Sequence, residues 1–460
     1  MRYGTIKNKP VETSLTPLAI LRRIKGERMP FFLDSAKGDK KLGNKSYLGC
    51  NPRETLKSRG SEIVVEGRDS RHLMAEDPLG VLRELLDKYP KAESSSGLTC
   101  GAVGCLSYDF AAHNLGIDFT NEKPAEVWDL FFGIYTSVLE WDTGSGKYTL
   151  HYLDETEVGF WEKVLSEDLK AEEDEDGWEK RLSGLIFPEE DLYYDGFRKI
   201  KEHIRKGNVY EVNLSQCFEA RDTADPVALY TQLRKKNPAD FMTYMDFGPY
   251  QVLSSSPERL FECRSRVVTT RPIKGTIARG KTAEEDLEAR ETLIHSEKDI
   301  SELLMIVDLM RNDLSLSCIP ESVRVDEMYR LESYANVHHL VSTIEGRLRE
   351  GEDAISLMRH VFPGGSITGA PKRAAVEVIE EVEAFSRGIY TGSLGYFSLN
   401  GDADFNILIR TILKQGDRCC FYGGGAITWD SDEEVEYDET IAKSSPLIDL
   451  FTTLGDEDEA

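Results

Sequence analysis

The chain has 460 residues, 40% hydrophobic and 30% charged, a balance typical of a folded globular protein. Its formal net charge of −26 argues against a nucleic-acid-binding surface, which needs clustered Lys and Arg to displace counterions. The polar N-terminus and the lack of a long apolar stretch predict neither a secretory signal nor a membrane span. The eight cysteines form no C-x-x-C pair, which disfavours a zinc ribbon or a thioredoxin-type site. We therefore expect a cytoplasmic protein that meets anionic ligands with local cations, helix N-termini or a metal.

The first half of the chain is rich in strand-like segments. A helix opened by Pro78 is expected over 78–89, and a second one over 157–170, just before an acidic run at 171–180 that we interpret as solvated. Strands are expected at 30–35, 62–67, 130–141 and 147–153.

From about residue 190 helices become more frequent. Apolar residues at helical spacing predict a helix over 192–207, followed by a strand over 209–220. One face of that strand is unusually polar, since it carries Glu211, Asn213 and Ser215. Further strands are expected near 251–256, 265–273, 389–398, 405–414 and 418–428, with helices near 282–295, 297–312, 370–384 and 433–450. Strands and helices do not alternate strictly, so the predicted fold class is α+β: largely antiparallel β-sheets packed as a sandwich, with helices on the outside.

Two acidic pairs stand out, each at a spacing that places both carboxylates on one helix face. Asp299 and Glu302 form the first pair, and Glu436 and Glu439 form the second. Brought together, the two faces would form an oxygen-rich site of the kind that Mg²⁺ prefers. The alternative is that both pairs are ordinary exposed carboxylates, because the chain has 82 acidic residues.

Four other side chains are candidates for chemistry. Lys274 in RPIKGT becomes a nucleophile if it points into a pocket, and Glu258 in SSSPER becomes a general acid or base if it is enclosed. The alternative for both is exposure to solvent. His339 and Arg410 lie in apolar, strand-like runs, where the arginine needs either a substrate carboxylate or a buried ion-pair partner.

Two segments are rich in glycine: FPGGSITGAPK (362–372) and YGGGAIT (422–428). Because glycine has no Cβ, the backbone of such a segment can lie close to a ligand or form a tight turn. The first runs into a helix, so its N–H groups could hold an anion, or it is simply a tight turn. The second could approach a ligand or form a strand bulge.

Taken together and in order, these motifs resemble one family. SSSPER, RPIKGT, EKDISELLMIVDLMRNDL, FPGGSITGAPK, FNILIR and GGGAITWDSDEEVEYDETIAKS are similar to the chorismate-binding domain. Anthranilate synthase component I, aminodeoxychorismate synthase component I, isochorismate synthases and salicylate synthases share that domain. The resemblance covers about 190–452, with weaker matches such as FFLDSA and SYLGCNP before it. It implies an N-terminal anthranilate synthase component I-like part (1–188), a catalytic part (189–452) and an acidic tail (453–460).

The resemblance also implies roles for single residues. Glu302 and Glu439 would bind Mg²⁺, with Asp299 and Glu436 beside them, and the metal would hold the ring carboxylate of chorismate. The remaining substrate contacts would come from Arg410, Tyr390 and the Gly425 backbone at the enolpyruvyl carboxylate, His339 at the ring, Lys443 near a carboxylate, and Thr276.

Position 274 distinguishes the subfamilies. Aminodeoxychorismate synthases resemble PIKGT here and anthranilate synthases resemble PIAGT, so Lys274 favours amination at C4, with Lys274 as nucleophile and Glu258 as proton donor and acceptor. Glu211 departs from the pattern, because the ammonia-adding enzymes usually have Gln there and the water-adding enzymes have Lys. We hypothesise that Glu211 holds ammonium or interacts with Glu258.

The resemblance implies partners as well. With no amidotransferase segment visible, ammonia would come from a glutamine amidotransferase subunit, and tryptophan could occupy the N-terminal part near FFLDSA and SYLGC. Two alternatives stay open: an anthranilate synthase component I in which Lys274 is tolerated, and a catalytically silent relative that binds a metabolite.

Overall fold

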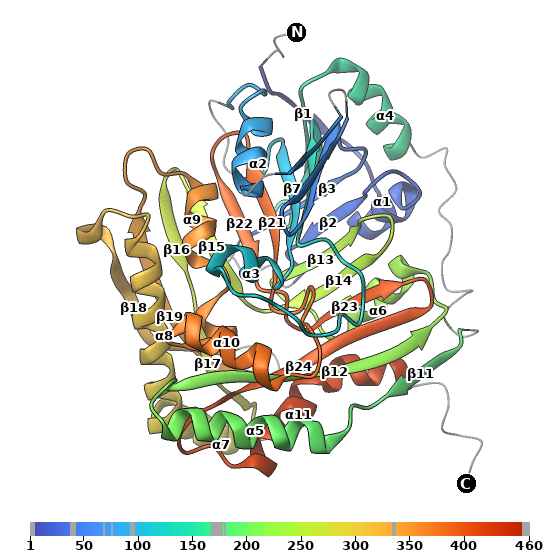
Figure 1. Cartoon of the computed structure of the whole chain (residues 1–460). Coiled ribbons are helices and arrows are strands. Elements are labelled where there is room, and N and C mark those ends of the chain that lie inside the picture. The colour runs from blue at the N-terminus through green and yellow to red at the C-terminus, as the bar shows by residue number, and fades with distance from the viewer. Residues whose placement is uncertain are drawn as a thin grey trace.

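The structure is a computed structural model that describes residues 5–36, 43–67, 70–74, 77–92, 97–166, 178, 181–333 and 337–452. The acidic tail at 453–460 and nearly all of the acidic run at 171–180 lie outside these residues. Within them, the chain forms two large antiparallel sheets with helices packed around them (Figure 1). The predicted α+β class is confirmed.

The first sheet contains strands from both halves of the chain. In spatial order they are β1 (Lys7–Val11), β10 (Lys147–Tyr152), β9 (Ser137–Asp142), β3 (Lys45–Gly49), β2 (Phe31–Asp34), β13 (Phe241–Asp246), β14 (Gln251–Ser256), β23 (Thr411–Gln415), β24 (Arg418–Ile427), β12 (Glu211–Asp222) and β11 (Ser183–Ile186), with the short β20 (Gly369–Ala370) paired to β12.

The second sheet also contains strands from both halves of the chain. Its order is β17 (Ile273–Ala278), β19 (Val337–Arg347), β16 (Val267–Thr270), β15 (Arg259–Arg264), β22 (Ala403–Asn406), β21 (Ser393–Ser398), β7 (Gly101–Leu106), β8 (Leu130–Tyr135), β4 (Glu54–Arg59), β5 (Glu62–Glu66) and β6 (Arg71–Met74), with β18 (Arg324–Ser333) paired to β19. The segments 1–188 and 189–452 therefore share both sheets.

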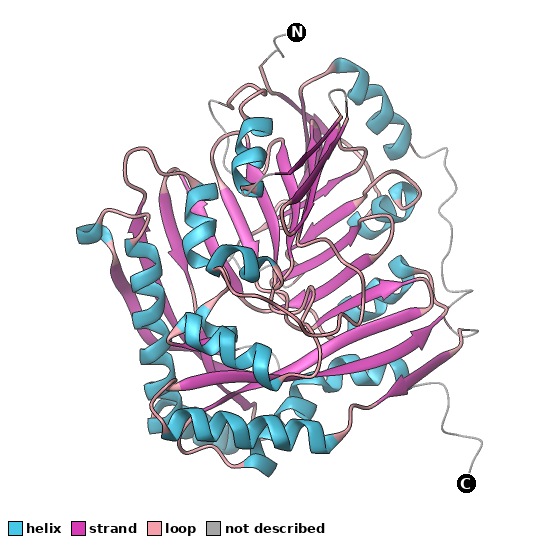
Figure 2. Cartoon of the chain, in the orientation of Figure 1, coloured by secondary structure: helices cyan, strands magenta, loops and turns pink. Residues whose placement is uncertain are grey.

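Most helices lie on the periphery of the sheets, as Figure 2 shows. They are α1 (Pro17–Ile24), α2 (Pro78–Leu86), α3 (Phe110–Leu115), α4 (Glu155–Leu165), α5 (Glu190–Arg205), α6 (Pro226–Lys236), α7 (Ala283–Ile294), α8 (Glu297–Ser315), α9 (Ala354–Val361), α10 (Lys372–Val382) and α11 (Glu433–Thr452). Between the sheets lies an apolar core that includes Phe31, Val103, Tyr135 and Met245. Outer cores join α1, α4, α6 and α11 to the first sheet, and α2, α8 and α9 to the second.

Two predicted strands are divided. The run 130–141 forms β8 and β9, which belong to different sheets, because the chain crosses between them at Thr136. The run 405–414 is interrupted between β22 and β23, so the prediction that Arg410 lies in a strand is wrong.

Candidate active site

Lys274 points into the protein from a bulge in β17. The pairing of β17 with β19 shifts register between Lys274 and Thr276, and the intervening Gly275 has φ +68°. A Cβ on Gly275 would lie 2.9 Å from Cγ of Asp299, so the bulge needs glycine. The Lys274 side chain is 11% exposed, and its Nζ lies 2.9 Å from Glu211 Oε1 and 3.8 Å from Glu302 Oε2. Burial opposes its charge, but these carboxylates prevail and raise the pKa of Lys274.

Glu258 lies where the chain passes from β14 of one sheet to β15 of the other. It is 5% exposed, so the alternative of a solvent-exposed carboxylate is wrong. The Ser366 hydroxyl donates a 2.7 Å hydrogen bond to Glu258 Oε1. Burial raises the pKa of Glu258 to about 7, even though this hydrogen bond and the Lys274 charge oppose the shift. A carboxyl with such a pKa can both donate and accept a proton near neutral pH.

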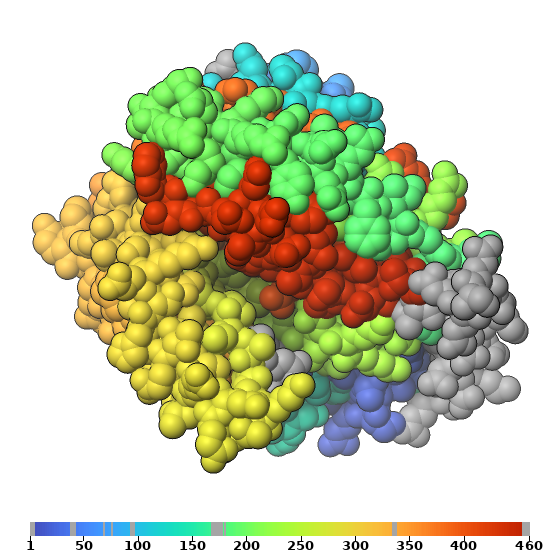
Figure 3. Space-filling view, turned by 90° about the horizontal axis from the view of Figure 1, so that it is seen from below, coloured from blue at the N-terminus to red at the C-terminus, as the bar shows by residue number. Residues whose placement is uncertain are grey.

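The two acidic pairs come from two different helices that approach Lys274. Glu302 comes from α8, and its buried Oε1 has no hydrogen-bond partner among the described residues; burial raises its pKa to about 7. Glu436 and Glu439 come from α11 and flank Gly425 of β24: a Cβ there would lie 3.5 Å from Glu436 Oε2 and 4.0 Å from Glu439 Oε1. Seen from below, the surface is hollowed between the yellow atoms of α7 and α8 and the red atoms of α11 (Figure 3).

Lysines partly neutralise these carboxylates. Lys298 Nζ lies 3.1 Å from Glu436 Oε1, and Lys443 Nζ lies 2.5 Å from Glu439 Oε1. Burial alone would raise the pKa of Glu439, but Lys443 lowers it overall. Among the described residues, no three acidic, His or Cys side chains form a ready-made metal cluster. The partnerless Glu302 oxygen and the cradle at Gly425 nevertheless fit a hard cation whose coordination is completed by other oxygens.

Arg410 is a cation without a partner among the described residues. It lies between β22 and β23 with φ +50°, and its backbone carbonyl accepts a hydrogen bond from Ser255 N at 3.1 Å. Its guanidinium is partly buried and makes no hydrogen bond or ion pair with any side chain or backbone group in the described part of the chain. Burial lowers its pKa. The alternative of a buried ion pair is therefore wrong, and the guanidinium is available for an anionic ligand.

The remaining predicted contacts lie around the same pocket. Tyr390 stacks on Tyr422 with ring centroids 5.0 Å apart, and a Cβ on Gly424 would lie 2.7 Å from Tyr390 Oη. His339, buried on β19, has its Nδ1 2.8 Å from the Thr276 hydroxyl.

The sequence did not single out two of the polar groups found here. Ser366 belongs to FPGGSITGAPK, interpreted above as an anion-binding turn, yet its hydroxyl binds Glu258. Lys298 precedes Asp299 directly, and its contact with Glu436 depends on how α8 and α11 meet. Only the three-dimensional arrangement reveals these contacts.

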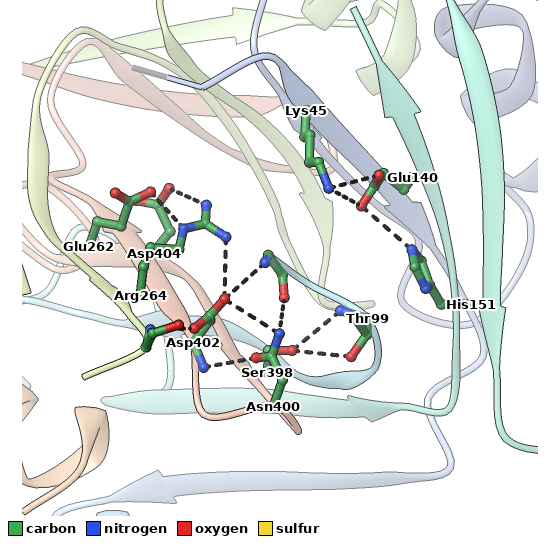
Figure 4. Close-up of polar contacts among 12 residues, drawn as sticks. Lys45, Thr99, Glu140, His151, Glu262, Arg264, Ser398, Asn400, Asp402 and Asp404 are labelled. Atoms are coloured by element: carbon green, nitrogen blue, oxygen red, sulfur yellow. Dashed lines mark hydrogen bonds and ion pairs between the residues drawn. The ribbon is translucent and has the colours of Figure 1, made fainter. Parts of the chain in front are cut away.

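A second cavity of about 300 Å³ lies between the sheets. FFLDSA and SYLGC contribute to it, together with residues 240–243 and 394–396. Tyr47 and Tyr396 meet edge to face on its wall, with ring centroids 5.7 Å apart. Charged networks flank this region (Figure 4): Arg264 Nε lies 2.9 Å from Glu262, and Lys45 lies 3.0 Å from Glu140. Its apolar wall with polar edges suits a small amphipathic molecule.

A buried lysine, and an arginine without a partner among the described residues, suit the binding of a small anionic molecule. A family model described as chorismate binding enzyme matches residues 29–449, and the chain belongs to that family. The protein is therefore a chorismate-utilising enzyme, which confirms the resemblance read from its motifs.

The relatives divide between two reactions. Aminodeoxychorismate synthase component 1 of Bacillus subtilis is 34% identical over 434 residues, covering 90% of this chain and 89% of the relative. Anthranilate synthase component 1 of Aquifex aeolicus is also 34% identical, over 459 residues, covering 94% and 91%. The crystal structure of anthranilate synthase component I from Streptococcus pneumoniae superposes with a TM-score of 0.79 at 29% identity, covering 88% of this chain and 92% of that one.

No helix in the described residues is long and apolar enough to cross a membrane.

Proposed function

We propose that this enzyme aminates chorismate at C4 and yields 4-amino-4-deoxychorismate, as component I of an aminodeoxychorismate synthase. The observation that carries the proposal is the position of Lys274: its amine is buried in the pocket, close to Glu211, Glu302 and the charge of Glu258. An alanine at this position would offer no nucleophile.

The proposed reaction has two displacements. The Glu211 carboxylate, 2.9 Å from Nζ, takes a proton from the Lys274 ammonium and returns it when the amine is released. The neutral Nζ bonds to C2, while the ring double bonds shift and the C4–O bond breaks; Glu258 gives its proton to the departing hydroxyl, which leaves as water. Ammonia then bonds to C4, the C2–N bond breaks, and Lys274 is released. The Glu258 carboxylate takes a proton from the incoming nitrogen, which restores the acid.

The other pocket residues bind and orient the substrate. Arg410, Tyr390 and the Gly425 backbone are proposed to hold the enolpyruvyl carboxylate, with His339 and Thr276 beside the ring and Lys443 near a carboxylate. Glu302 and Glu439, with Asp299 and Glu436 beside them, would hold Mg²⁺, which when bound neutralises the ring carboxylate.

The ammonia is proposed to come from a separate glutamine amidotransferase subunit. Support comes from the name component 1 carried by the relatives on both sides of the family. Aromatisation to 4-aminobenzoate would then need another enzyme.

Purified protein incubated with chorismate, Mg²⁺ and an ammonium salt tests the reaction, with products separated by HPLC and identified by mass. We expect 4-amino-4-deoxychorismate from the wild type and none from Lys274→Ala. Lys45→Ala, which removes an ion-paired lysine at the second cavity, should leave this product unchanged. Anthranilate from the wild type would refute the proposal in favour of the second candidate, anthranilate synthase component I, which the equally similar Aquifex relative supports.

We also propose that the second cavity binds tryptophan, whose indole would pack on Tyr47 and Tyr396. Tryptophan released on denaturing the protein, or a calorimetric binding signal, would support this. Neither signal, together with unaltered thermal stability in added tryptophan, would refute it.

A further inference from the structure

Two carboxylates compete for the single ammonium group of Lys274. Glu211, fully buried on β12, lies at hydrogen-bond distance, with Oε1 2.9 Å from Nζ. Glu302, reaching across from α8, lies at 3.8 Å, which is too far for a hydrogen bond. Glu211 therefore fixes the position of Nζ.

Because Lys274 Nζ stays with Glu211, the Glu302 carboxylate lacks hydrogen-bond partners among the described residues. Glu302 Oε1 is buried without a hydrogen-bond partner among the described residues, and its Oε2 has only the long contact with Lys274. A buried carboxylate in this state attracts any cation within reach. If Glu211 lost its charge, the nearest such cation would be Lys274 itself, because closing 3.8 Å to hydrogen-bond distance needs only a small side-chain movement.

We propose that Glu211 is a positioning residue: by holding Lys274 Nζ it keeps the amine off Glu302, so that this carboxylate stays available to a divalent cation. The lysine and the cation then act side by side without sharing a ligand. The identity of the cation rests on the proposed function, whereas the competition between Glu211 and Glu302 for Lys274 rests on the contacts alone.

The test measures Mg²⁺ binding to the full-length chain by isothermal titration calorimetry, which needs no turnover. In Glu211→Gln the amine is expected to shift to Glu302, and the Kd for Mg²⁺ should rise about tenfold, since an ion-paired hydrogen bond must now be displaced. Glu211→Asp, which keeps the charge, should recover most of that loss. Glu54→Gln is the matched control, because it neutralises another buried glutamate, which lies on β4 and contacts Tyr89 and Lys88. It should leave the Kd for Mg²⁺ unchanged.

A double variant decides whether Glu211 acts through Lys274. In a Lys274→Ala background, Glu211→Gln should change the Kd for Mg²⁺ less than about twofold, because no amine is left to move. A tenfold loss in that background, no loss in Glu211→Gln alone, or no Mg²⁺ binding by the wild type would each overturn the proposal. Circular dichroism confirms that each variant is folded. If the wild type made anthranilate, the proposed C4 reaction would fail while this comparison would still decide the role of Glu211.

Discussion

We expect Arg410 to lower the free energy of unfolding of the protein and, at the same time, to strengthen the binding of chorismate. Its guanidinium is partly buried, has no partner among the described residues, and sits on a residue with φ +50°. Arg410→Met keeps most of the side-chain length but removes the charge. Losing a charge-assisted hydrogen bond to a substrate carboxylate costs about 1.5–3 kcal/mol, so the KM for chorismate should rise about 10- to 150-fold. Removing an uncompensated, partly buried cation should raise the free energy of unfolding by about 1 kcal/mol.

The matched comparison is Arg387→Met. Arg387 is also buried, but its Nη2 and Nε lie 2.7 and 2.9 Å from the Glu383 carboxylate, and Nη1 donates to Ile367 O at 2.8 Å. Without Arg387 the buried Glu383 carboxylate loses its ion-pair partner, so the free energy of unfolding should fall by about 3–5 kcal/mol. Steady-state kinetics and thermal unfolding of both variants give the result. If Arg410→Met destabilised the protein as much as Arg387→Met, or bound chorismate normally, the interpretation of Arg410 as a substrate-binding cation would be refuted.

Three further outcomes follow from the geometry. The rate at which Lys274 forms its substrate adduct without ammonia, followed by intact mass, should fall as pH rises through about 7, because the proton-donating form of Glu258 is then lost. The proposed transfer of the Lys274 proton to Glu211 stays within the site and adds no pH dependence, so in Glu258→Gln the rate should be low and independent of pH. Gly425→Ala should fold normally, since its Cβ meets nothing closer than 3.5 Å, yet raise the KM for chorismate about tenfold by filling the cradle beside Glu436; a normal KM would contradict this placement. Gly159→Ala, in the middle of α4 with no atom within 4 Å of the new Cβ, should add about 0.5–1 kcal/mol of stability, and a lower melting temperature would contradict the helix assignment.

The sequence predicted the parts of the site that depend on local spacing. The acidic pairs lie on helices as their i, i+3 spacing indicates, and the polar face of the strand at 209–220 places Glu211 in the pocket. The assignment of magnesium ligands and substrate contacts stays a prediction, because the described contacts bring these residues together without showing what they bind.

Other features depend on contacts between distant segments. The break between β22 and β23 at Arg410 could not be predicted, because the mostly apolar run 405–414 looks like one strand. The hydrophobicity of a sequence does not indicate that a residue has a positive φ. The division of 130–141 into β8 and β9 is equally hidden, because both strands are buried and only their partners in different sheets separate them. Likewise, the pairing of Glu258 with Ser366 joins residues more than a hundred positions apart.

The interleaving of the two halves has a consequence for any attempt to divide the chain. β13 pairs with β2, and β21 pairs with β7, so a fragment beginning at residue 189 would lose one neighbour of each strand. Both strands would become edge strands with unpaired backbone N–H and C=O groups, which promote aggregation. The segment that carries Lys274 and Glu258 is thus not a separable catalytic module. The two sheets hold its reacting groups in place, and the first 188 residues contribute strands to both of these sheets.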